Sequence, residues 1–317
     1  MKAREIVRVD RVVKDVRPGF GLRRKRVLDG ITLAVREGEI FGFVGPNGAG
    51  KTTTLKVLLG LVRASSGSAH ILGHDVRETA FRKHIGFLPE NPYFHEFLTG
   101  REFLRFYARL AGLARRGREP RIEELLGWVG LSQAGDARLR TYSKGMLQRL
   151  GIAQALVHDP MVVFLDEPMS GLDPLGRKDI RDLILRLRDE GKTVFMNTHI
   201  LPDVEMLCDR VAIIVRGRIR WEGRIEEFLA DGAEPESDVV LARLSPELAA
   251  RLEERFGGAL RGHGERVELR VPHKEVEGVV GAALGSGAEL VSVTPHRASL
   301  EAVFLSAVGQ GGEEEGR

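Results

Sequence analysis

The chain has 317 residues, 43% of them hydrophobic, which is enough for one large domain and a small one. Lysine and arginine number 48 against 45 aspartates and glutamates, so the charge gives no reason to expect a nucleic-acid partner. The single cysteine, Cys208, excludes an internal disulfide and fits a reducing compartment. No apolar run is as long as a membrane-spanning helix, and MKAREIVRVD lacks a signal peptide's apolar core. We therefore expect a soluble intracellular protein that can dock on a membrane protein.

Three strands are expected ahead of the most informative stretch of the sequence. Residues 6–16 roughly alternate apolar and polar side chains, and residues 27–35 and 40–44 supply two more strands. The third strand leads directly into GPNGAGKTT, and leucines at helical spacing follow from Leu55. A strand, a loop of the form G-x-x-x-x-G-K-[ST] and a helix together predict a phosphate-binding loop.

The residue types in this loop suit a polyphosphate. Gly45, Gly48 and Gly50 allow a tight turn in which successive backbone N–H groups converge on phosphate oxygens. The helix that starts near Lys51 adds its positive end, and the Lys51 ammonium reaches the terminal phosphates. The Thr52 hydroxyl is placed to ligate Mg²⁺. The expected nucleotide-binding residues here are Gly45, Pro46, Asn47, Gly48, Ala49, Gly50, Lys51, Thr52 and Thr53.

Residues 98–158 predict a helical insert in an otherwise alternating α/β domain. Thr99 and Glu102 form a capping box ahead of the first helix, and a second helix is expected to start near Pro120. A third begins near Ser143, whose hydroxyl and adjoining N–H groups predict a second anion site. An ordinary helix N-cap is the alternative interpretation of Ser143.

Two further strands end in residues suited to phosphoryl transfer. The apolar run 161–165 is followed by Asp166, which can hold Mg²⁺ through its water shell, and Glu167, which can polarise a water. A strand at 193–197, beyond an amphipathic helix at 180–188, leads to His199. This histidine could bond a terminal phosphate, with a structural role as the alternative.

The remainder of the chain predicts a second, smaller domain. Strands at 211–215 and 218–221 flank Arg216-Gly217, a hairpin turn, and residues 231–237 are polar enough for a linker. Beyond the linker the expected order is β-α-β-β-α-β, which suggests a ferredoxin-like α+β domain over 238–310. A helix at 300–308 and a disordered tail at 311–317 complete the chain.

As a set, these motifs resemble the ATP-binding cassette (ABC) ATPases that drive ABC transporters. GPNGAGKTT, a loop near residue 90, YSKGMLQR, VVFLDEP, SGLD and NTH follow in the order typical of that family, over residues 5–230. The resemblance implies an ABC-type P-loop core over 1–230 and a head-to-tail homodimer that closes on two ATP molecules. It implies that Ser143 and Gly145 face the phosphate loop of the other subunit and that Asp173 communicates across the dimer. It also implies a catalytic set of Lys51, Glu167 as the general base and His199 at the γ-phosphate.

Three departures from the family pattern stand out. The signature is YSKGM rather than LSGGQ, so Lys144 and Met146 replace a glycine and a glutamine, while Ser143 and Gly145 remain. Glu90 stands where a glutamine is usual, and its carboxylate could bind Mg²⁺ or water in the nucleotide site. The aromatic residue that usually stacks on adenine aligns with Val16, and Phe20 is the substitute or only an apolar anchor.

YSKGM, LPE and the C-terminal SLEAVF resemble the stand-alone ATPase subunits of exporters of drugs, lipids or polysaccharides. This resemblance implies ATP and Mg²⁺ as ligands, a separate multi-span permease as partner, no nucleic acid, and a place on the cytoplasmic face of the membrane. A non-transport ABC ATPase acting on DNA or ribosomes is the alternative. Such proteins usually carry a coiled-coil insertion or a second cassette, and neither is present. A small-molecule kinase leaves YSKGM, SGLD and His199 unexplained.

Overall fold

The computed structural model describes residues 4–17, 24–230, 236–256, 260–263, 266–296, 300 and 304. They form two compact units, one ending at Ile225 and the other starting at Glu226. Phe20, most of the helix expected over 300–308 and the tail at 311–317 lie outside the described residues.

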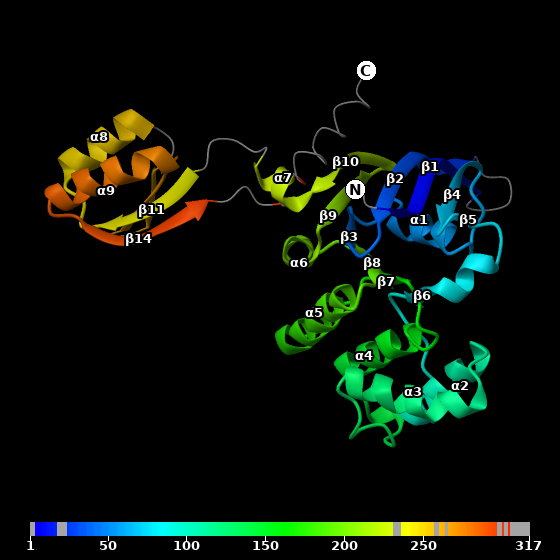
Figure 1. Cartoon of the computed structure of the whole chain (residues 1–317). Coiled ribbons are helices and arrows are strands. Elements are labelled where there is room, and N and C mark those ends of the chain that lie inside the picture. The colour runs from blue at the N-terminus through cyan, green and yellow to red at the C-terminus, as the bar shows by residue number, and fades with distance from the viewer. Residues whose placement is uncertain are drawn as a thin grey trace. The chain divides into compact units, whose positions relative to one another are not determined.

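The first unit is built around a six-stranded sheet in the order β10-β9-β3-β8-β7-β6 (Figure 1). Five strands run parallel and β10 is antiparallel to β9. Every residue of β3, β7 and β8 is buried, which explains their continuous apolar character in the sequence. The strands are β3 (Ile40–Val44), β6 (Ile85–Leu88), β7 (Val162–Asp166), β8 (Thr193–Thr198), β9 (Arg210–Val215) and β10 (Arg218–Arg224).

A second, antiparallel sheet has the order β2-β1-β4-β5. The helix α1 (Lys51–Leu58) contacts strands of both sheets, and one continuous apolar core, which includes Phe41, Phe43 and Phe195, joins them. This packing fixes the start of α1 against the central sheet. The strands of the second sheet are β1 (Glu5–Val16), β2 (Lys25–Arg36), β4 (Ser66–Ile71) and β5 (His74–Asp75).

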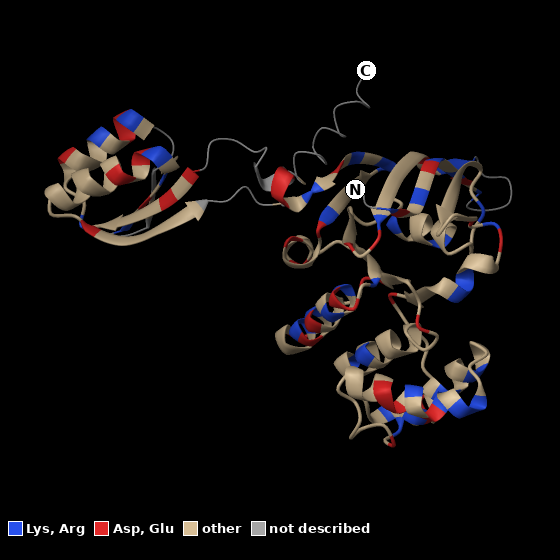
Figure 2. Cartoon of the chain, in the orientation of Figure 1, with Lys and Arg blue, Asp and Glu red and all other residues tan. Residues whose placement is uncertain are grey.

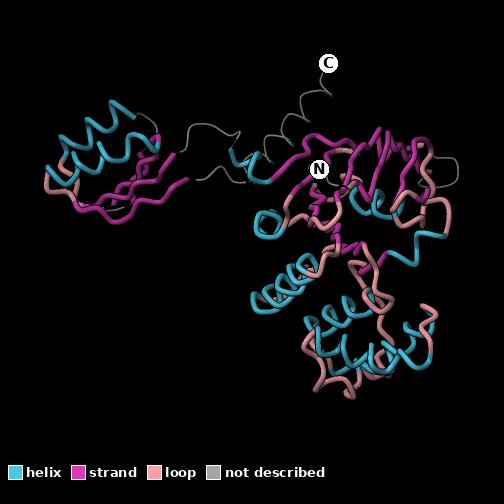
Figure 3. Tube along the Cα trace, in the orientation of Figure 1, coloured by secondary structure: helices cyan, strands magenta, loops and turns pink. Residues whose placement is uncertain are grey.

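Between β6 and β7 the chain changes from strands to helices (Figure 3). The capping box is confirmed: Thr99 accepts from the N–H of Glu102, and Glu102 accepts from that of Thr99. The helices are α2 (Gly100–Leu110), α3 (Arg115–Trp128) and α4 (Lys144–Ala155), with the short 3₁₀ turns η1 (Ala80–His84) before β6 and η2 (Leu139–Thr141) before α4.

The expectation that the second helix starts near Pro120 was wrong, because α3 begins at Arg115 and contains that proline. The proline removes one hydrogen bond near the helix start. Burial of Ile122, Leu125 and Leu126 holds the helix in place despite that loss.

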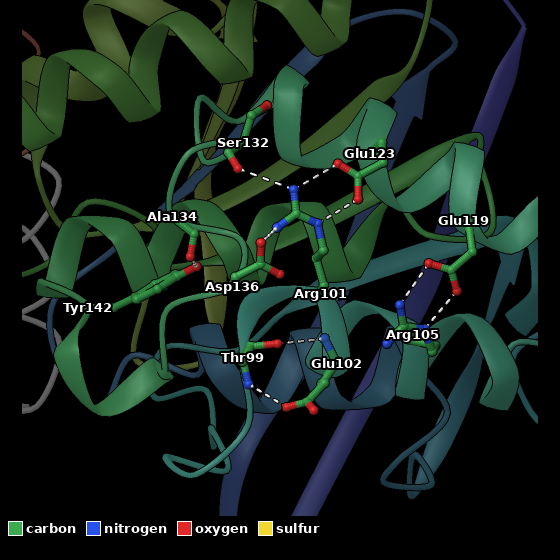
Figure 4. A network of polar contacts seen from close by, with 10 residues as sticks. All are labelled: Thr99, Arg101, Glu102, Arg105, Glu119, Glu123, Ser132, Ala134, Asp136 and Tyr142. Atoms are coloured by element: carbon green, nitrogen blue, oxygen red, sulfur yellow. Dashed lines mark hydrogen bonds and ion pairs between the residues drawn. The ribbon is translucent and has the colours of Figure 1, made fainter.

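Ion pairs join α2 to α3 across this helical part (Figure 4). Arg101 donates to both carboxylate oxygens of Glu123, at 2.6 and 3.0 Å, and also pairs with Asp136. Arg105 binds Glu119 in the same two-pronged way, at 2.7 and 2.8 Å. These ion pairs fix α2 against α3, and both helices contact α4, whose N-cap is Ser143.

Two helices connect the last strands of the central sheet. The helix expected at 180–188 instead begins at Pro174, because Asp173 caps it and a proline is favoured in the first turn. The predicted β9–β10 hairpin is confirmed, with positive φ at Arg216 and Gly217. The two connecting helices are α5 (Pro174–Asp189) and α6 (Leu201–Leu207), and a further helix, α7 (Ile225–Ala230), follows β10.

The second unit has an antiparallel sheet in the order β12-β13-β11-β14, with two helices packed on it. Glu236 and Ser237, expected in the linker, belong to β11, where they pair with β13 and β14. The elements are β11 (Glu236–Ala242), α8 (Pro246–Phe256), β12 (Leu260–His263), β13 (Arg266–Pro272), η3 (His273–Glu275), α9 (Val276–Gly285) and β14 (Glu289–His296).

Candidate active site

The parallel sheet gathers the motif residues at one edge. Strands β3, β8, β7 and β6 are neighbours and run parallel, so their carboxyl ends lie together. In the register of the sheet, Asn197 pairs with Phe43 on one side and with Asp166 on the other. The phosphate loop, the Asp-Glu pair, the segment ending at His199 and the loop of Glu90 all leave the sheet at this edge.

The loop between β3 and α1 has the tight geometry expected of a phosphate cradle. Gly48 and Gly50 have φ values of 79° and 111°, in the region that favours glycine. A Cβ atom at Gly45 would lie 2.3 Å from the carbonyl oxygen of Ile214, so no side chain fits there. Gly50, at the N-cap of α1, offers no side-chain cap, which leaves the N–H groups of the first turn available to an anion.

Lys51 is buried at the start of α1. Its ammonium donates to the carbonyl oxygen of Gly45 at 2.7 Å and lies 3.9 Å from Oε1 of Glu167. Burial lowers the pKa of Lys51, and the charge of Glu167 opposes that shift. Asp166 and Glu90 oppose it too, which places both carboxylates within electrostatic reach of this ammonium. The site therefore holds one cation among three acids.

Asp166 and Glu167 are 4% and 6% exposed, at the end of β7. Asp166 accepts a hydrogen bond from the side-chain amide of Asn197. Burial raises the pKa of Asp166, and the charges of Glu90 and Glu167 raise it further. This carboxylate lies in surroundings with excess negative charge.

Glu167 has an unusual backbone conformation, with a φ of 49°. A left-handed conformation costs a residue with a side chain roughly 1–2 kcal/mol. Its N–H donates to the carbonyl oxygen of Asn197 at 2.8 Å, which helps to hold the turn. Backbone strain of this kind clusters at functional sites, where it aims a side chain.

The side chain of Glu167 is held by three groups. Besides Lys51, Nδ1 of His199 lies 2.8 Å from Oε1, and the hydroxyl of Thr198 donates to Oε2 at 3.3 Å. Sequence reasoning named His199 but gave no separate role to Thr198 or Asn197. The available signal was a polar Asn-Thr pair at the end of a wholly buried strand.

The candidate metal ligands carry donor atoms that suit Mg²⁺. Thr52 and Glu90 are exposed, and with Asp166 they offer only oxygen donors, the type that Mg²⁺ prefers. In the described part of the chain, no group of three His, Cys, Asp or Glu residues could hold a metal alone. Magnesium usually needs only one or two carboxylates besides water and substrate phosphates. The buried, negatively surrounded Asp166 fits that requirement.

Ser143 and Asp173 lie at the starts of other helices. Ser143 is exposed and accepts from the N–H of Met146 at 3.2 Å, and Asp173 accepts from that of Gly176 at 2.8 Å. Among the described residues, no hydrogen bond or ion pair joins either side chain, or Gly145, to the phosphate loop. Both expected interfacial residues are thus N-caps within their own chain. Val16, at the end of β1, is half-buried.

A phosphate cradle at the end of a parallel strand, with buried Asp and Glu on a neighbouring strand, defines the class of P-loop ATPases. Comparison with known proteins narrows this class. Residues 28–170 match the ABC transporter family. An uncharacterised ABC transporter ATP-binding protein of Synechocystis is 43% identical over 97% of this chain and 86% of its own.

Two further relatives agree. The daunorubicin resistance ATP-binding protein DrrA3 of Streptomyces coeruleorubidus is 37% identical over 90% of this chain and 92% of its own. The solved structure of cbiO1 from Clostridium perfringens, part of the ABC transporter complex cbiONQ, is 27% identical. It superposes with a TM-score of 0.63 over 72% of this chain and 91% of its own.

The chain belongs to the ATP-binding proteins of ABC transporters. It is an ATP-binding subunit and an ATPase with the P-loop fold of that family. Among the described residues, no helix is both long and apolar enough to span a bilayer.

Proposed function

We propose that this chain is the ATP-hydrolysing subunit of an ABC exporter and works as a homodimer on the cytoplasmic face of the membrane. A separate multi-span permease would carry the substrate, in the class of drugs, lipids or polysaccharides. The 37% identity to a daunorubicin resistance ATP-binding protein over nearly the whole chain supports the exporter assignment. No nucleic-acid partner is proposed.

The main support for the homodimer is that the two halves of the site do not meet within one chain. Ser143 and Asp173 cap exposed helix starts and make no described contact with the phosphate loop. Ser143, with the N–H groups of α4, and the phosphate loop are each suited to phosphate. In a head-to-tail dimer, the Ser143–Gly145 segment of one copy would complete the site of the other.

The contacts of Lys51 and Glu167 support a hydrolytic mechanism. Lys51 would leave Glu167, 3.9 Å away, for the terminal phosphates of ATP. Glu167 would then orient a water and take its proton as the oxygen attacks the γ-phosphorus in line. The bond from that phosphorus to the ADP oxygen would break and release inorganic phosphate. His199, 2.8 Å from Glu167, would contact the γ-phosphate.

Asp166, Thr52 and Glu90 are the residues proposed to hold Mg²⁺, which would neutralise phosphate charge when bound. Asp166 is the central ligand in this proposal because it is buried beside two other acids. Asn197 would orient Asp166 through its side-chain amide. The loop from Gly45 to Thr53 would hold the phosphates.

An exposed aromatic cluster supports a membrane-protein partner. Tyr93 and Phe97 on the loop after Glu90 are 78% and 66% exposed, and Phe106 on α2 is 50% exposed. The ring of His95 contacts all three, so they form one patch. Contiguous exposed apolar side chains mark interaction sites. We propose that the permease contacts this patch.

For the second unit we propose a ferredoxin-like accessory domain over about 238–310. The element order β-α-β-β-α-β and the antiparallel sheet order β12-β13-β11-β14 support this assignment. No chemistry is proposed for it.

Purification tests the transporter assignment against the alternative of a non-transport ATPase. The tagged chain, extracted from membranes in mild detergent, is expected to bring down a multi-span protein, and Phe97→Ser to weaken that association. Co-purification with nucleic acid that salt removes, without a membrane partner, would favour the alternative.

A further inference from the structure

A buried acid beside the site lacks a partner. Asp203, in the first turn of α6, is 3% exposed. Its Oδ2 atom has no hydrogen-bond partner among the described residues. Buried polar atoms in native structures nearly always have a hydrogen-bond partner, so each exception calls for an explanation, such as stored strain or a role in function. Burial raises the pKa of Asp203, as expected for a carboxylate removed from water.

Two arginines of α5 provide positive charge that acts on the Asp203 carboxylate. Arg177 and Arg181 lie one helical turn apart, are half-buried, and each lowers the pKa that burial raises. The two helices α5 and α6 are in contact, and α5 carries bands of both charges (Figure 2). Arg181 already directs Nη1 to the sulfur of Met206 at 3.1 Å. The side chain of Arg177 makes no hydrogen bond or ion pair within the described residues.

The positions of these two residues connect separate parts of the catalytic edge. Arg177 lies in the first turn of α5, where its N–H donates to the carbonyl oxygen of Asp173 at 2.9 Å. Asp203 follows His199 by four positions in the sequence. The intervening Ile200 donates its N–H to the Thr198 hydroxyl at 3.1 Å, and that hydroxyl donates to Glu167. A shift of α6 toward α5 would therefore move the groups that hold Glu167.

We propose that Asp203 is a positioning residue for His199 and that its unpaired carboxylate forms an ion pair with Arg177 when α5 and α6 move together on bound ATP. The described conformation then carries the cost of a buried unpaired acid, and ATP binding relieves it. This inference rests on the proposed roles of Glu167 and His199. It adds a link between the Asp173 cap and the histidine loop.

The test is a double-mutant cycle with Asp203→Asn, Arg177→Gln and both together, using Arg181→Gln as the matched control on the same helix. Melting temperature is measured with and without a non-hydrolysable ATP analogue and Mg²⁺, and kcat and KM for ATP are measured separately. Without nucleotide, D203N is expected to melt higher than the parent because it removes a buried charge. Its kcat is expected to fall about tenfold, and the analogue to raise its melting temperature less.

The remaining variants separate positioning from simple structural support. R177Q is expected to lower kcat as D203N does, the double variant to be no slower than either, and R181Q to stay within about twofold of the parent. Asp203→Glu, which keeps the charge, is expected to recover most of the lost turnover. A lower melting temperature for D203N without nucleotide, or additive effects in the double variant, would overturn the proposal. The analogue-induced shift does not depend on Glu167 as base, so normal turnover by E167Q would remove the proposed mechanism and leave this test intact.

Discussion

Replacing Glu167 with glutamine separates the two functions that its contacts suggest. Glutamine keeps the size of the side chain and a carbonyl acceptor for Thr198, but it removes the negative charge 3.9 Å from the Lys51 ammonium. At that distance two unit charges attract by about 4 kcal/mol for an effective dielectric constant near 20. Both side chains are 7% exposed, so solvent screens this attraction weakly. Without nucleotide, the E167Q protein should therefore melt lower than the parent, because Lys51 loses its buried partner.

ATP binding is expected to respond in the opposite direction: the E167Q protein should bind ATP more tightly than the parent. Lys51 no longer has to leave a carboxylate, and if about a third of the attraction appears in binding, the Kd for ATP falls about tenfold. Loss of the base should slow turnover by about 10²- to 10⁴-fold. Phosphate release measures turnover, and titration with a fluorescent ATP analogue measures affinity. Glu124→Gln, on the exposed side of α3, is the control. Unchanged turnover would refute Glu167 as the base, and weaker ATP binding would refute the restraint on Lys51.

Three further predictions concern packing, the loop and pH. Arg101→Ala should lower the free energy of unfolding by about 1–3 kcal/mol, because this arginine is 21% exposed and binds two acids. Arg105→Ala removes an exposed ion pair and should lower it by less than about 1 kcal/mol. Urea titrations measure both changes. Gly45→Ala should abolish ATP binding in calorimetry, because the new Cβ atom would meet a backbone oxygen. Gly48 has open space around it but a φ of 79°, so Gly48→Ala should cost only about 1 kcal/mol of conformational free energy and keep measurable ATP binding. The pKa of Asp166 is raised in the folded protein, so its stabilising contribution is complete below the ordinary Asp value near 4 and is lost as pH rises through the raised value. Asp166→Asn should therefore gain melting temperature over the parent as pH rises from about 4 to 7 without Mg²⁺, and a constant difference would contradict this assignment.

The local signals in the sequence were sufficient to place the phosphate loop and the Asp166-Glu167 pair at the ends of buried strands, while their roles in the reaction stay predictions. Each follows a short apolar run, and parallel strands bring such ends to one edge without further information. The start of α5 was missed although Asp173 and Pro174 form an N-cap and a first-turn proline. Apolar periodicity, which begins later in that helix, was given more weight than the capping signal.

Other features depend on contacts between distant segments, which no local pattern contains. The 3.9 Å approach of Lys51 to Glu167 requires β3 and β7 to be separated by a single strand, β8. The positive φ of Glu167 is stabilised by the hydrogen bond that its own N–H donates to the carbonyl oxygen of Asn197, thirty positions along the chain. The buried Oδ2 atom of Asp203 lacks a hydrogen-bond partner because of how α6 packs against its neighbours, which the local sequence does not reveal.

A mixed-dimer experiment tests most directly whether two copies build each ATP site together. Lys51→Ala removes the phosphate loop's cation, and Ser143→Arg blocks the helix start that would face the other copy. Each variant alone should be inactive, yet a mixed dimer keeps one intact loop opposite one intact Ser143. Random mixing should thus recover about a quarter of parental ATP turnover if the two sites act independently. A mixture no more active than either variant alone would contradict the shared site.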